Sequence, residues 1–192
     1  MKLIKSFKIL LLNYTVISTI MTGETNKILI YDFKKSKPLM EWYVVNDNVM
    51  GGYSNGSISK NKNGNGIFTG KISLDNNGGF SSVRYNLEKR IVSPLDTLIF
   101  HVNGDNKYYQ IRIKHSIYDR HVYTKKIFIK DGWHFLKVSL NEMNASFRGR
   151  RLRMNNFDKS QITEIGVLFG NKVEERFKLE IDSIYLNKYE QK

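Results

Sequence analysis

Apolar and polar residues alternate with a period of two along most of this chain, and this pattern limits the possible folds more than any other feature. Tyr109, Ile111 and Ile113, for example, are separated by Gln110 and Arg112. A strand points successive side chains to opposite faces, whereas a helix would need apolar residues about 3.6 positions apart. The pattern therefore predicts half-buried β-strands and an all-β chain.

Alternating segments follow one another along nearly the whole sequence, and together they predict roughly ten short strands. The expected strands cover residues 28–31, 57–60, 67–74, 80–86, 97–103, 109–114, 121–129, 133–140, 162–169 and 177–182. Glycine and asparagine, which tolerate a positive φ, separate them. We interpret Asn77, Gly78 and Gly79 as a hairpin tip that leads into the strand at Phe80. Residues 141–160 lack the pattern and predict a long loop with room for one helical turn.

Length and composition suit one domain with a substantial core. The chain has 192 residues, of which 41% are hydrophobic, so it is too short for two domains of ordinary size. Residues 1–26 resemble an export leader, because three lysines precede an apolar stretch, although polar residues dilute it. We expect a leader at 1–26, a single sandwich domain at 27–190 and no stable membrane anchor. The protein would be exported or periplasmic if the leader is a signal peptide, and otherwise cytoplasmic.

The formal net charge of +13 would suit a phosphate-rich partner. However, the basic residues are spread along the chain. The densest run, at residues 148–153, belongs to no known nucleic-acid-binding motif. A nucleic-acid partner is therefore not expected.

No arrangement typical of catalysis or metal binding occurs in the sequence. The 4 histidines stand singly, and no serine occupies a nucleophile elbow. Cysteine is absent, which excludes disulfides and thiolate metal sites. We therefore expect no enzyme activity, no cofactor and no metal site.

Three segments combine apolar, acidic and turn-forming residues in a distinctive order. Their characteristic residues are Trp42, Asp47, Met50, Gly51 and Gly52, then Asn76, Asn77, Gly78, Gly79, Phe80 and Arg84, and finally Asp105. In this order and spacing the segments resemble the complex I intermediate-associated protein 30 family. The resemblance runs from about Tyr31 to Tyr185 and includes Arg148 and Arg150.

This resemblance implies a galactose-binding-like β-sandwich, a form of jelly roll. It also implies a binding role, because the mitochondrial members are chaperone-like factors in the assembly of NADH:ubiquinone oxidoreductase. The leader lacks the arginine-rich, serine-rich character of a transit peptide, so we expect a bacterial relative. The expected function is a noncatalytic protein-binding domain, and a carbohydrate-binding module on the same kind of sandwich is the alternative. The residues that carry the resemblance are candidates for partner binding or for the core of the motifs.

Asp47 and Arg84 are the most suggestive charged residues, because each stands among apolar and turn-forming neighbours. Either they form a buried ion pair that joins their two segments, or they bind a partner. We expect Asp47, Asn77 and Arg84 to converge in space. Asp105 and Arg112 pose the same alternatives.

The glycines and tryptophans also have two interpretations each. Gly51 and Gly52 serve a tight turn, or they bring backbone amides close to a ligand. Trp42 and Trp133 anchor the core, or they form a sugar-stacking platform, and core burial is the favoured interpretation for both. An exposed ring in a concave region would favour sugar binding, whereas a broad, flat face would favour a protein partner.

Overall fold

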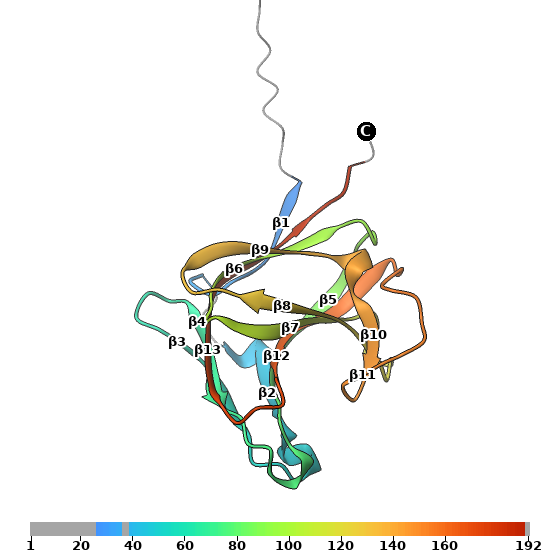
Figure 1. Ribbon diagram of the computed structural model, residues 1–192. Helices are drawn as coiled ribbons and strands as arrows, with labels where there is room; N and C mark the ends of the chain where they lie inside the picture. Colours follow the sequence, from blue (N-terminus) through green and yellow to red (C-terminus); the bar gives the residue numbers. More distant parts are fainter. Residues whose placement is uncertain (1–25, 36–38, 191–192) are drawn as a thin grey trace, which may run out of the picture.

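A computed structural model describes residues 26–35 and 39–190, which form two antiparallel β-sheets packed as a sandwich (Figure 1). The smaller sheet has six strands in the order β3-β4-β13-β6-β9, and β1 pairs with β13 beside this path. Its strands are β1 (Lys27–Asp32), β3 (Asn55–Lys60), β4 (Gly66–Lys71), β6 (Thr97–Asn103), β9 (Trp133–Ser139) and β13 (Arg176–Asn187). The all-β sandwich expected from the sequence is therefore confirmed.

The larger sheet has seven strands in the order β11-β10-β8-β7-β12-β5-β2. They are β2 (Trp42–Asn46), β5 (Ser81–Ile91), β7 (Lys107–Lys114), β8 (Val122–Ile129), β10 (Asn144–Phe147), β11 (Arg150–Arg151) and β12 (Gln161–Phe169). Short 3₁₀ turns join some of the strands, at Leu39–Glu41, Asp47–Met50, Asp75–Asn77 and Leu140–Glu142. No helix in the described part of the chain is long and apolar enough to cross a membrane.

The core lies between the two sheets and consists of the apolar members of the alternating pattern. Ile111, Ile113 and Val83 come from the larger sheet, Phe100 and Leu179 come from the smaller one, and all five are buried. Their polar neighbours on the same strands face away from the core. Burial of this apolar surface is the main stabilising contribution, since the chain has no cysteine for a disulfide.

Two expectations about the connections need correction. Residues 141–160 are not one long loop, because they contain β10 and β11 after the 3₁₀ turn at Leu140–Glu142. The turn Asn77-Gly78-Gly79 is not a hairpin tip. It connects β4 of the smaller sheet to β5 of the larger one, and a chain that changes sheets cannot pair its two flanking strands. The expected leader falls almost wholly on residues 1–25, which lie outside the described residues.

Candidate functional site

The buried carboxylate of Asp47 holds two connections together at the end of the sandwich that lies away from β1 and the C-terminus (Figure 1). Its Oδ1 accepts a hydrogen bond from the backbone N–H of Ser54 at 2.9 Å. Its Oδ2 accepts from the N–H groups of Gly79 at 2.6 Å and Phe80 at 3.3 Å. Burial raises the pKa of Asp47, but the hydrogen bonds from Ser54, Gly79 and Phe80 outweigh it and hold the pKa below its usual value.

Glycine is required at two positions because the carboxylate approaches the backbone closely. A Cβ atom at Gly52 would lie 2.4 Å from Cγ of Asp47, and one at Gly78 would lie 2.5 Å from its Oδ2. Gly51 turns the chain with a φ of 89°. The side chain of Asn76 adds a link between the two connections, because its Nδ2 donates to the carbonyl oxygen of Gly51 at 3.0 Å. The glycine-rich motifs therefore serve both a tight turn and a close approach, and the group approached is Asp47.

The two ion pairs considered from the sequence are absent among the described residues. Asp47 obtains its partners from backbone amides, and Arg84 lies on β5 with its side chain toward Tyr43 and Ser82. Asp105 likewise accepts from the hydroxyl of Tyr109 at 2.9 Å and from the N–H of Lys178 at 2.8 Å. The expected convergence holds for Asp47 and the segment around Asn77 and fails for Arg84, since β5 carries Arg84 away from the turn.

The two linked connections, residues 47–54 and 75–80, form a unit that we call the locked tip. Inside the locked tip, the carboxylate oxygens of Asp47 are hydrogen-bonded to backbone N–H groups. Its outer side carries large apolar side chains. Val49, Met50 and Tyr53 are all exposed, and Met50 is 55% exposed. A rigid loop that displays apolar side chains to water is typical of a binding surface.

Arg84 belongs to a row of residues that crosses the larger sheet on the face away from the core. Tyr43 of β2 stands opposite Arg84, Arg84 opposite Gly166 of β12, and Gly166 opposite Arg112 of β7. Glu164, two residues before Gly166, accepts from Arg112 Nη2 at 3.2 Å and from the Tyr43 hydroxyl at 2.6 Å. We call these five residues the arginine row. The sequence did not reveal it, because register between distant strands brings its members together.

The arginine row carries buried charge on a sheet face that water would normally cover. Arg112 is only 7% exposed and Glu164 only 5%. Burial and the positive charge of Arg84 lower the pKa of Arg112 to about 10. The buried pair of Arg112 and Glu164 thus takes the place of the Asp105–Arg112 pair considered from the sequence.

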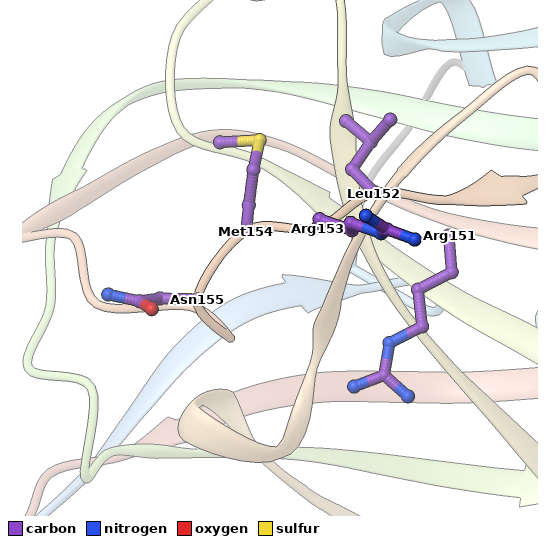
Figure 2. A pocket seen from close by; sticks show the side chains of 5 residues that line it. All are labelled: Arg151, Leu152, Arg153, Met154 and Asn155. Carbon is purple, nitrogen blue, oxygen red and sulfur yellow. The ribbon is translucent and has the colours of Figure 1, made fainter.

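Arg148 and Arg150 lie at the far edge of the larger sheet, around β10 and β11. The guanidinium groups of Arg120 and Arg148 approach the ring of Phe147 to 5.4 Å and 5.5 Å. A hollow of about 500 Å³ lies beside β11 (Figure 2), and its lining residues are Arg151, Leu152, Arg153, Met154 and Asn155. Leu152 and Met154 point to one side of the chain there and Arg151 to the other. None of these arginines forms an ion pair within the described ranges, so this edge keeps its positive charge.

The two tryptophans occupy opposite environments. Trp42 is buried and stacks on Tyr85 with ring centroids 5.4 Å apart, as expected for a core anchor. Trp133 is 42% exposed, so the expectation of core burial is wrong for it. It lies on β9, the edge strand of the smaller sheet, where Phe135 shares its outward face. The ring of His101 on the neighbouring strand β6 contacts both, with centroid distances of 5.0 Å to Trp133 and 4.6 Å to Phe135.

The comparisons with known proteins concern the family and the fold. The family model described as complex I intermediate-associated protein 30 (CIA30) matches residues 31–181. No curated protein matches the chain. Among solved structures, the family 11 carbohydrate-binding module of the cellulosomal cellulase Lic26A-Cel5E of Clostridium thermocellum is similar, with a TM-score of 0.68 at 14% identity over 88% of this chain and 98% of that chain.

Two further solved structures share the fold. The Clostridium thermocellum family 11 module in complex with a β-1,3-1,4-mixed-linked tetrasaccharide gives a TM-score of 0.65 at 14% identity, over 88% of this chain and 99% of that one. An agarase gives a TM-score of 0.57 at 15% identity, over 86% of this chain and 25% of the agarase. At these identities the similarity establishes the two-sheet fold of a carbohydrate-binding module and nothing about the ligand.

Proposed function

Because this chain belongs to the complex I intermediate-associated protein 30 family, we propose that it is a noncatalytic, chaperone-like protein-binding domain of a bacterial relative. The observation that carries the proposal is the locked tip, where a buried carboxylate fixes a loop that exposes Val49, Met50 and Tyr53. Apolar and aromatic side chains on a rigid surface contribute most of the affinity in protein interfaces.

The hydrogen bonds that Asp47 accepts in the locked tip support this role, because they lower the entropic cost of binding a partner. Ordering a mobile loop on association consumes part of the free energy of binding. Here the three hydrogen bonds to Asp47 order the backbone before any partner arrives. The arginine-rich edge around Phe147 lies at the opposite edge of the larger sheet from β2, and its positive charge favours a partner that carries acidic groups there.

We expect aspartate at Val49 and Met50 to abolish partner capture without changing stability. A charge cannot enter an apolar contact without a large desolvation cost, and both side chains are exposed in the free protein. Wild type and the double variant Val49→Asp/Met50→Asp would be used to purify partners from the cells that express the chain. The expected result is a defined protein partner recovered with wild type and lost with the double variant, at an unchanged melting temperature.

Ile91→Asp is the matched control. Ile91 is 59% exposed, close to the 55% of Met50, but it ends β5 at the opposite end of that strand from the locked tip. This control should capture the partner as wild type does. Equal capture by the double variant would show that the locked tip is not the contact surface.

A carbohydrate-binding module is the second candidate, and Trp133 and Phe135 are the observation that favours it. Exposed aromatic rings stack on sugar rings, and hydrogen-bonding groups beside them fix the orientation of the ligand. The His101 ring contacts both of these rings, and its Nδ1 is 2.9 Å from Oδ2 of Asp182. The outer face of β6 and β9 therefore combines two exposed rings with a polar group.

For this candidate we expect gels that contain mixed-linked β-1,3-1,4-glucan to slow the migration of the wild-type protein. Trp133→Ala should migrate freely in the same gels, because loss of one stacking ring removes much of the contact area. Tyr118→Ala, which removes an exposed ring from the β7–β8 connection, should remain slowed. Free migration of wild type in gels of this and other neutral glucans would eliminate the second candidate.

A further inference from the structure

The arginine row contains more positive than negative charge in a place where charge is costly. Arg84 and Arg112 stand on either side of Gly166, and Glu164 is the carboxylate that pairs with this row. Glu164 pairs with Arg112, and Arg84 forms no ion pair among the described residues, which leaves the row with one net positive charge. The buried charge of Arg112 is thus matched by Glu164, whereas the half-buried charge of Arg84 beside it is not, so the row can accept one negative charge from a ligand.

The hydrogen bonds of the two arginines are also incomplete. Nε of Arg112 is buried without a hydrogen-bond partner in the described part of the protein. Arg84 makes a 3.5 Å contact from Nε to Oγ of Ser82, and it interacts with Tyr43, whose ring centre lies 5.9 Å from its guanidinium. A guanidinium has five N–H donors, so most of those of Arg84 remain available to a ligand.

Gly166 explains how the two arginines come together. A Cβ atom at this position would lie 3.1 Å from Cγ of Arg112 and 2.6 Å from the carbonyl oxygen of Val83. The stem of Arg112 therefore lies against the bare backbone of β12 at Gly166, the residue that also stands opposite Arg84. Arg84 itself is half-buried, so its guanidinium is reachable from solvent.

We propose that the arginine row binds the carboxylate of a hexuronic sugar. A carboxylate matches the single missing negative charge, and its planar shape suits the forked donors of Arg84. The positions around it on the same face supply hydroxyl and amide groups for the remaining sugar hydroxyls. Asn86 follows Arg84 on the same face of β5, Gln110 precedes Arg112 on β7, and Thr124 stands opposite Arg112 on β8. This site lies on a different sheet from Trp133 and apart from the locked tip, so it goes beyond both proposed functions.

Isothermal titration calorimetry with trigalacturonate tests the proposal. We expect wild type to bind trigalacturonate and to give no saturable binding with neutral galactotriose, because the row recognises the carboxylate. Arg84→Met keeps most of the side-chain length without the charge and should weaken binding at least about tenfold, the scale of a lost charge-assisted hydrogen bond. Arg84→Lys keeps the positive charge but loses the two parallel N–H donors of the guanidinium. Its affinity for trigalacturonate should therefore fall between those of wild type and Arg84→Met.

Lys137→Met is the matched control, because it removes one positive charge from an exposed position on β9, in the other sheet. It should bind trigalacturonate within about twofold of wild type, as expected for an exposed charge. A melting curve of each variant verifies folding, and Arg84→Met should still capture the partner that depends on Met50. Equal affinity for the neutral trimer, unchanged binding by Arg84→Met, or binding of a glutamate-rich peptide in place of trigalacturonate would each overturn the proposal.

Discussion

Replacement of Asp47 with alanine is expected to lower the free energy of unfolding by about 3–5 kcal/mol, a loss typical of a broken buried charge network. The reason is that the N–H groups of Ser54, Gly79 and Phe80 would all lose their acceptor inside a closed turn. Urea denaturation followed by tryptophan fluorescence measures the change. Asp75→Ala is the matched control in the neighbouring connection, since Asp75 is exposed and accepts from the hydroxyl of Ser73. It should cost less than about 1 kcal/mol.

The contribution of Asp47 should also depend on pH. Its pKa is lowered in the folded state, so folding favours the ionised form. The stability difference between wild type and Asp47→Ala should be complete above the unfolded value near 3.8 and should shrink as the pH falls through the lower folded value. A difference that stays constant through this acidic range, or a loss below about 1 kcal/mol at neutral pH, would contradict the role of the carboxylate as the lock.

Replacement of Trp42 with alanine is expected to cost about 3–5 kcal/mol, the usual range for truncation of a large buried aromatic side chain. Trp42 contacts the rings of Tyr85, Tyr31 and Phe33, with centroids 5.2–5.4 Å apart. Its indole nitrogen has no hydrogen-bond partner among the described residues, so the loss comes from packing alone. The same denaturation experiment measures it.

Trp133→Ala is the matched comparison, since it removes the same side chain from the exposed face of β9. We expect it to cost less than about 1 kcal/mol, as is usual for a surface substitution. Equal losses for the two variants would mean that Trp133 packs as tightly as Trp42, and would remove the aromatic surface on which the carbohydrate candidate depends.

The strands were predictable because their side-chain pattern is local. The expected strand 97–103 coincides with β6 (Thr97–Asn103), where Leu98, Phe100 and Val102 keep the period of two although Ile99 is buried as well. By contrast, β2 (Trp42–Asn46) was not among the expected strands, since only Trp42 of its five residues is fully buried. The turn at Asn77 was read as a hairpin because glycine and asparagine give a positive φ in any tight turn. Which sheet the next strand joins depends on packing that the local sequence does not contain.

The candidate site was predictable where close approach of the backbone requires glycine, because glycines are visible in the sequence. Gly52 and Gly78 are the positions at which the backbone approaches the carboxylate of Asp47 closely, although the sequence suggested an arginine as the partner of this carboxylate. The partner of Arg112 was not predictable, since strand register brings Glu164 to it across more than 50 positions of the chain. The exposure of Trp133 was missed for a similar reason. A tryptophan on an alternating strand faces in or out according to the register of its neighbours.

The pairing of β1 with β13 has a mechanical consequence. The two strands are antiparallel, with Lys27 opposite Asn187, so both leave the sheet at the same place. A force that pulls these two ends apart acts across the ladder and opens it one residue pair at a time, from Lys27 toward Asp32. At each step the force acts only on the next pair of hydrogen bonds, so the bonds break one after another and not together. Tension between the ends would therefore peel β1 away while the far end of the sandwich, with the locked tip, carries little of the load.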